Sequence, residues 1–190
     1  MVKRDFIRNI LLLLIVIIGA ILLRIFVFST FKVSPETANT YLKSGDLVTI
    51  KKNIQPKYKD FVVYRVGKKD YVSRVIAVEG DSVTYMDDIF YLNNMVESQA
   101  YLEKMKAHYL NHAPFGTLYT DDFTVATITA DKYQKVPKGK YLLLNDNRMN
   151  DNRKNTNDSR RFGLINASQI KGLVTFRVLP LSDFGFVEVE

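Results

Sequence analysis

The most regular feature of the sequence is a long apolar run near its start. Residues 10–28 are apolar except for Arg24. Because an α-helix rises about 1.5 Å per residue, about 20 apolar residues span a hydrocarbon core about 30 Å thick. The pattern therefore predicts a transmembrane helix over residues 10–29. A cleaved signal peptide is the alternative, but the bulky phenylalanines of Phe26–Phe31 make a poor cleavage site.

The charges beside the apolar run indicate its orientation. Lys3, Arg4 and Arg8 precede the run. Basic residues favour the cytoplasmic side of a membrane. We therefore expect residues 1–9 in the cytoplasm, a single pass through the cell membrane, and one extracellular domain over residues 30–190.

Beyond residue 30 the apolar residues occur in short runs separated by turn-forming residues. These runs are rich in β-branched and aromatic residues, which is typical of strands. They are Leu47–Ile50, Phe61–Val66, Tyr71–Val78, Ser82–Tyr85, Ile89–Leu92, Tyr141–Leu144 and Gly172–Val178. Residues 101–110 are predicted to form a short helix. Because strands and helices do not alternate regularly, the pattern predicts a mainly β domain.

The composition narrows the chemistry of the domain. The chain has no cysteine, which excludes disulfides and thiolate chemistry. Four basic residues (Lys3, Arg4, Arg8 and Arg24) and one acidic residue (Asp5) precede the domain. Without them the formal net charge falls from +7 to +4. This mild excess suits an anionic membrane surface and carries no clustered signature of nucleic-acid binding. The pairs Asp87–Asp88 and Asp121–Asp122 have no nearby His or Cys and indicate turns, so we expect no metal and no cofactor.

One segment carries a specific resemblance. Residues 70–81 read Asp-Tyr-Val-Ser-Arg-Val-Ile-Ala-Val-Glu-Gly-Asp. The segment resembles a strand of the type I signal peptidases that normally reads Tyr-x-Lys-Arg-Val-Ile-Ala-x-x-Gly-Asp. That family cleaves peptides with a serine nucleophile and a lysine general base. In this chain Ser73 stands at the position of the lysine, just before Arg74.

A second segment resembles the region of the family's nucleophile. Residues 33–46 align with Val-x-Gly-x-Ser-Met-x-Pro-Thr-Leu-x-x-Gly-Asp, and only Val33, Leu42, Gly45 and Asp46 match. The alignment places Thr37 at the position of the nucleophilic serine. Both members of the catalytic pair are therefore replaced.

The third match is the most specific. Residues 151–163 follow the family's Asp-Asn-Arg-x-x-Ser-x-Asp-Ser-Arg-x-Phe-Gly almost residue for residue. The triplet Asp-Asn-Arg also occurs five residues earlier, and the sequence leaves open which copy holds the family position. In the family this motif supports the lysine. The supporting residues that the resemblance assigns are Arg74, Asp146, Arg148, Asp151, Arg153, Thr156, Asp158, Ser159 and Arg160.

The replaced residues change what the chain can do. A hydroxyl is a weak nucleophile until a base removes its proton, and the family's base is a lysine whose pKa is lowered by burial. The Ser73 hydroxyl is not basic near neutral pH. Other basic side chains are interpreted as solvated surface groups, and they are Lys43, Lys51, Lys52, His108 and His112.

The resemblance also implies a shape and a binding mode. The family has a coiled, mostly antiparallel β domain with an inserted β subdomain, here expected at about residues 83–136. Extended peptides bind the family by adding a strand to exposed β edges, a mode that needs no nucleophile. The corresponding residues here are Val33, Ser34, Tyr71 and Val72.

Two functions from different classes fit these observations. The chain is similar to degraded signal peptidases from the pilus-assembly loci of Gram-positive cocci. That similarity implies a non-catalytic pilus-assembly factor that binds pilin precursors or a sortase. The alternative is a divergent active signal peptidase that uses Thr37 or Ser34 with an unexpected base.

Overall fold

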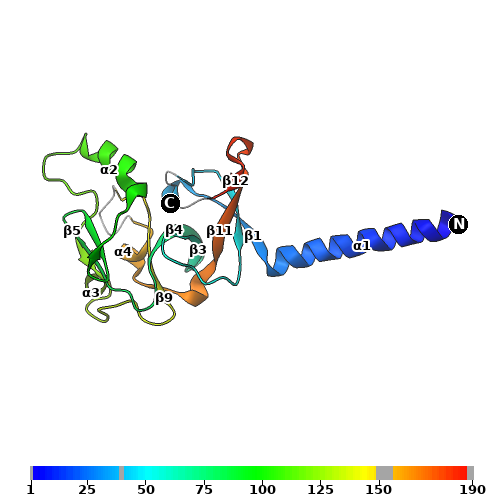
Figure 1. The fold of residues 1–190 in the computed structure, drawn as a ribbon, viewed down its shortest axis with the longest axis horizontal. Helices are drawn as coiled ribbons and strands as arrows, with labels where there is room; N and C mark the ends of the chain where they lie inside the picture. The colour runs from blue at the N-terminus through cyan, green and yellow to red at the C-terminus, as the bar shows by residue number, and fades with distance from the viewer. Residues whose placement is uncertain (1, 39–40, 149–155, 188–190) are drawn as a thin grey trace.

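The N-terminal apolar run forms one long helix. The computed structural model describes residues 2–38, 41–148 and 156–187. Helix α1 (Val2–Phe26) extends away from the rest of the chain (Figure 1), and Arg4–Leu22 is long and apolar enough to cross a membrane. The helix starts and ends earlier than the predicted residues 10–29. It ends because Phe28–Lys32 form strand β1, which pairs with Leu47–Lys51.

The larger β structure is an eight-stranded antiparallel sheet. Its main path runs β1-β2-β11-β3-β4-β9-β10, with β12 paired to β11. The strands are β1 (Phe28–Lys32), β2 (Leu47–Lys51), β3 (Phe61–Val66), β4 (Lys69–Ala77), β9 (Lys140–Leu144), β10 (Ile165–Asn166), β11 (Ile170–Leu179) and β12 (Gly185–Phe186). Strand β11 pairs with β2 and with β3, so one long strand joins the strands next to α1 to the centre of the sheet.

A smaller sheet lies at the end of the domain far from α1 (Figure 1). Its four strands follow the order β7-β6-β5-β8 and all lie within the predicted insertion. They are β5 (Val83–Met86), β6 (Ile89–Leu92), β7 (Met95–Val96) and β8 (Phe123–Thr124). The helices that accompany the two sheets are α2 (Glu103–Leu110), α3 (Val125–Ile128) and α4 (Ser159–Phe162), with 3-10 turns at Pro35–Thr37, Ala100–Leu102, Ala167–Gln169 and Leu181–Asp183.

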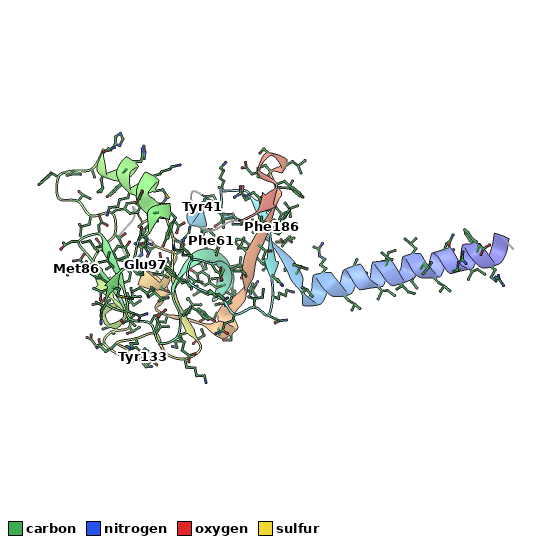
Figure 2. All side chains as sticks on the ribbon, viewed as in Figure 1. Tyr41, Phe61, Met86, Glu97, Tyr133 and Phe186 are labelled. Carbon is green, nitrogen blue, oxygen red and sulfur yellow. The ribbon has the colours of Figure 1, made fainter. Side chains whose placement is uncertain are left out.

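The core joins the two sheets. Inward residues of the small sheet, Val83, Tyr85 and Phe90, share one buried cluster with Leu142 and Leu144 of β9. Alternate residues of β5 point inward, because successive side chains of a strand face opposite sides. Figure 2 shows the side chains filling the space between the sheets. The sheets therefore form one packed unit.

The predicted fold class is confirmed: the domain is mainly β with antiparallel sheets. Phe61–Val66 and Ile89–Leu92 have the predicted bounds, and the other predicted strands differ at their ends by one or two residues. The helix predicted over residues 101–110 is a 3-10 turn followed by α2. The short strands β7, β8, β10 and β12 were not predicted, because two residues show no periodicity.

Candidate functional site

Ser73 lies in the middle of β4 with its hydroxyl enclosed. The residue is 1% exposed. Its Oγ donates to Asn145 Oδ1 at 2.6 Å and lies 3.1 Å from the Tyr64 hydroxyl, which in turn donates to the Asn157 carbonyl at 2.9 Å. Side chains from β3 and from the loop after β9 therefore occupy the space that a longer residue at Ser73 would need.

The groups around Ser73 supply no base. Burial raises the pKa of the Tyr64 hydroxyl well above its usual range, so the phenol stays neutral. Asn145 is an amide and does not titrate. Within the described residues, the hydrogen-bonding partners of Ser73 Oγ are therefore neutral groups at physiological pH.

Thr37 ends a 3-10 turn that lies against β4. The residue is 2% exposed, and its Oγ1 lies 3.2 Å from Ser34 Oγ and 3.4 Å from the Ser34 carbonyl. No lysine or histidine of the described chain hydrogen-bonds either hydroxyl. The structure thus brings the turn of Thr37 to the strand of Ser73. The Thr37 hydroxyl contacts Ser34 within its own turn, and the Ser73 hydroxyl bonds to Asn145.

Contacts of Val33 and Asp46 hold the two ends of the loop that carries Thr37. The Val33 amide donates to the Asp46 carbonyl at 2.8 Å. The Asp46 carboxylate accepts the Lys43 amide at 2.9 Å and lies 3.0 Å from Arg177 Nε on β11. Lys43 Nζ pairs with Asp183 at 3.1 Å, so its ammonium is engaged away from the turn. These contacts hold the loop without offering a base.

A fully buried ion pair joins β4 to the loop after β9. Arg74 donates to both oxygens of Asp146, at 2.8 and 2.6 Å, and both side chains are fully buried. The guanidinium also lies 3.8 Å from the centre of the Tyr101 ring and 4.3 Å from that of Phe61. Bidentate pairing and aromatic contact both favour arginine over lysine at this site.

The Asp-Ser-Arg part of the third motif fixes the same loop to β9. Asp158 caps α4 by accepting the Arg160 amide, and it also accepts the Asn145 amide at 3.0 Å. Arg160 Nη2 pairs with Asp158 at 2.8 Å, and Ser159 Oγ accepts the Leu143 amide at 2.9 Å. Thr156 is also buried. These residues hold Asn145 against Ser73.

The duplicated triplet has one copy in the described chain. The first copy is buried: Asp146 pairs with Arg74, and Arg148 has no exposed surface. Asp151 and Arg153 of the second copy lie outside the described residues. The copy nearest β9 therefore holds the pair with Arg74, which the sequence left open.

Three of the four residues expected at the peptide-binding edge have buried side chains. Val72 has no exposed surface, and Tyr71 and Val33 are also buried. Strand β4 pairs with β3 over residues 69–74 and with β9 only from Arg74 onward. The Val72 side chain packs with Val33, Phe61 and Val63. Among the described residues, the second edge of β4 therefore has no strand partner before Arg74, and the peptide groove stays a prediction. Ser34 is partly exposed.

Comparisons with known proteins agree with the motifs. A model of the family described as signal peptidase, peptidase S26, matches residues 5–179. The chain belongs to the signal peptidase family, peptidase S26. It is 37% identical over 169 residues to signal peptidase I of Bacillus caldolyticus, covering 86% of each chain. It is 35% identical over 166 residues to signal peptidase IB of Staphylococcus aureus, covering 85% of this chain and 83% of that protein.

A solved member of the signal peptidase family has the same fold. The crystal structure of a signal peptidase I from Enterococcus faecalis superposes with a TM-score of 0.54 at 31% identity. The match covers 64% of this chain and 98% of that one. The fold of the signal peptidase family is thus present here, together with the departures at Thr37 and Ser73.

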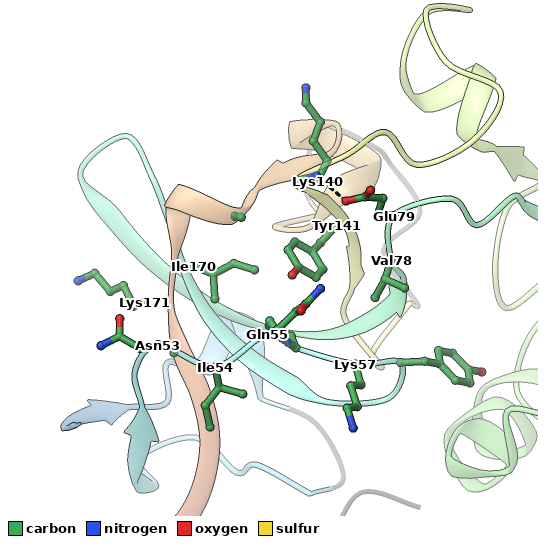
Figure 3. A pocket seen from close by; sticks show the side chains of 15 residues that line it. Asn53, Ile54, Gln55, Lys57, Val78, Glu79, Lys140, Tyr141, Ile170 and Lys171 are labelled. Atoms are coloured by element: carbon green, nitrogen blue, oxygen red, sulfur yellow. Dashed lines mark hydrogen bonds between the residues drawn. The ribbon is translucent and has the colours of Figure 1, made fainter. Parts of the chain in front are cut away.

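A large pocket is lined in part by Val78 and Glu79, near the end of the 70–81 segment. It has a volume of about 910 Å³ and lies between residues 53–58 and the start of β11, with Tyr141 and Ile170 in its lining (Figure 3). None of the predicted site residues lines it. The labelled Lys57, Lys140 and Lys171 extend in different directions in Figure 3, so they do not form a converging anion site.

The two histidines lie on α2 and just after its end. His108 is on α2, and His112 Nδ1 lies 2.8 Å from the His108 carbonyl at the end of that helix. Both are exposed. Their contacts are those of a helix end, as the interpretation of them as surface groups predicts.

Tyr64 and Asn145 are the site residues that the sequence did not reveal. Tyr64 falls within a predicted strand, and Asn145 lies just before the first Asp-Asn-Arg triplet. The sequence does give one signal: the short Ser73 stands where the family has a long lysine. Because protein interiors are closely packed, the space of the missing side chain must be filled by another residue. The sequence alone does not identify which one.

Proposed function

We propose that this signal-peptidase-like chain is a membrane-anchored pilus-assembly factor of a Gram-positive cell surface. In this role it binds pilin precursors or a sortase and does not cleave them. The observation that carries the proposal is the enclosure of Ser73 by Asn145 and Tyr64. A proton acceptor is absent at the one position where the family places it.

The chemistry of amide cleavage supports this proposal. Acyl transfer from a hydroxyl needs a base within about 3 Å of the nucleophile, directly or through one water. The hydrogen-bonding partner of Thr37 Oγ1 is Ser34, whose hydroxyl and carbonyl are not basic at neutral pH. The β-methyl of a threonine also crowds the line of attack. A binding role requires neither group.

The binding mode that we propose is an extended peptide added to a β edge. Such pairing uses main-chain hydrogen bonds and places alternate side chains in pockets. Ser34 offers a partly exposed approach, and β4 lacks a second strand partner in the described chain before Arg74. The burial of the Val72 side chain leaves this mode available, because an added strand bonds to the main chain of β4.

The second candidate is a divergent active signal peptidase. Two facts favour it: the relatives are named signal peptidase I, and Ser34 and Thr37 place two hydroxyls 3.2 Å apart. It requires an amine from elsewhere to approach these hydroxyls. The two candidates predict opposite results in one assay.

That assay uses the full chain in lipid vesicles. A pilin precursor with a photo-crosslinking residue near its signal-peptide junction is added, and products are analysed by mass spectrometry. We expect a crosslinked complex and an intact precursor. Signal peptidase I of Bacillus caldolyticus serves as the cleaving control. A new precursor fragment formed by this chain, and lost in Thr37→Ala, would establish the active alternative.

We also propose that α1 crosses the cell membrane once, with its N-terminus in the cytoplasm. Arg4 and Arg8 lie at the start of the candidate span Arg4–Leu22. Protease added to intact cells with the wall removed should degrade residues after Thr30 and spare an N-terminal tag. A protected domain would reverse the proposed orientation. A cytoplasmic reporter protein that stays undigested verifies that the cell membrane is intact.

A further inference from the structure

Two histidines lie one turn apart at the end of α2. His108 belongs to the helix, and His112 follows it by four residues. The backbone stays helical through Asn111, whose amide donates to the Ala107 carbonyl at 3.1 Å. Residues four apart share one face of a helix, so both imidazoles lie on the same side. Helical metal sites use two histidines at this spacing.

A hydrogen bond to the main chain sets the tautomer of His112. Its Nδ1 lies 2.8 Å from the His108 carbonyl, which can only accept. In the neutral ring Nδ1 therefore carries the proton, and Nε2 keeps its lone pair. Metal-binding histidines almost always donate their second ring nitrogen to a carbonyl or a carboxylate in this way. The backbone thus prepares His112 as a ligand.

The two rings are spaced for one shared ion. Their centres are 5.1 Å apart, and their planes meet at 52°. Two imidazoles on one tetrahedral ion, with bonds of about 2.0–2.1 Å, have ring centres about 5 Å apart. A surface pocket of about 200 Å³ is lined by both histidines, Tyr109 and Ala113. Both histidines are exposed, so their rings can turn toward an ion in this pocket while water completes its coordination.

The donor atoms select the kind of ion. Imidazole nitrogen suits Cu²⁺ and Zn²⁺, whereas Mg²⁺ and Ca²⁺ prefer oxygen ligands. Lys106 on the same helix pairs with Asp88 at 3.4 Å, and Lys104 is exposed, so solvent screens its charge. We infer that His108 and His112 together bind one divalent transition-metal ion, Cu²⁺ or Zn²⁺. This inference departs from the expectation of no metal and is independent of the proposed function.

The test titrates the full chain with Cu²⁺ near neutral pH, in a non-ionic detergent and without a polyhistidine tag. Electron paramagnetic resonance reports how many nitrogen atoms bind the copper. We expect one ion per chain, bound by two imidazole nitrogens. A large excess of Mg²⁺ should leave the spectrum unchanged, because Mg²⁺ prefers oxygen ligands.

Two single variants and a spacing control locate the ion. His108→Gln and His112→Gln should each remove one nitrogen from the spectrum and weaken binding at least about tenfold, since even the loss of a ligand's supporting partner costs that much. The combined change Ala107→His and His108→Gln keeps two histidines but places them five residues apart, on different faces of the helix. It should bind as weakly as His108→Gln. All three positions are exposed, so these variants should fold.

Several outcomes would overturn the inference. They are the absence of copper binding, a wild-type spectrum with a single nitrogen ligand, displacement of copper by Mg²⁺, undiminished binding in both glutamine variants, and full affinity in the spacing control.

Discussion

Asp146→Asn is expected to lower the free energy of unfolding of the full chain by about 3–5 kcal/mol. The reason is the environment of Arg74, which is fully buried and donates to both carboxylate oxygens of Asp146. An asparagine leaves the guanidinium charge in the interior without its counter-ion. Urea unfolding in detergent, followed by circular dichroism, measures the loss. The midpoint should fall with little change in the slope.

The duplicated triplet provides a matched control. Asp151→Asn makes the same chemical change five residues later in the sequence. If the first copy alone serves Arg74, this variant should lose less than about 1 kcal/mol, as is usual for sites away from a buried network. A larger loss in Asp151→Asn than in Asp146→Asn would show that the second copy carries the structural role. The assignment of the first copy would then be wrong.

The strands were predictable because their signal is local. Runs such as Phe61–Val66 combine β-branched and aromatic residues, and the structure has strands there. Strand β1 was missed for an equally physical reason. Its first residue, Phe28, ends the apolar run of the helix, and the strand conformation of Phe28–Lys32 depends on pairing with β2. Apolar character alone does not reveal where helix gives way to strand.

The sequence motifs predicted which residues belong to the site, but they did not predict which residues contact one another. The motifs located Ser73, Arg74 and Asp158, because their spacing is specific. The enclosure of Ser73 depends on Asn145, which lies 72 residues away in sequence. Likewise, the choice between two identical triplets depends on which one reaches Arg74. Such contacts are set by tertiary packing, so no local pattern contains them.

Ser73→Lys, which restores the family's residue type, is expected to destabilise the chain by several kcal/mol and to produce no cleavage. The new side chain must enter space occupied by Tyr64 and Asn145. Its amine must also leave water, and burial favours the neutral amine over the ammonium. Extra volume in a packed core costs about 1–3 kcal/mol before the charge is considered. Adding Thr37→Ser should not restore activity, because the space for a productive amine is still filled.

The cost of the added volume and the cost of burying the amine can be measured separately. An uncharged variant gives the first, and the pH dependence of stability gives the second. Ser73→Met adds a side chain of similar length without charge, so it measures the volume cost alone. For Ser73→Lys, the amine binds fewer protons in the folded state than in the unfolded state, because burial lowers its folded pKa. Stability relative to Ser73→Met should therefore rise as pH increases from the lowered folded pKa toward about 10.4, the unfolded value. A variant that is as stable at pH 7 as wild type and cleaves a secretory precursor would show that the site still accepts a catalytic lysine. The enclosure of Ser73 by Tyr64 and Asn145 would then not prevent catalysis, and the argument for a non-catalytic role from this enclosure would be wrong.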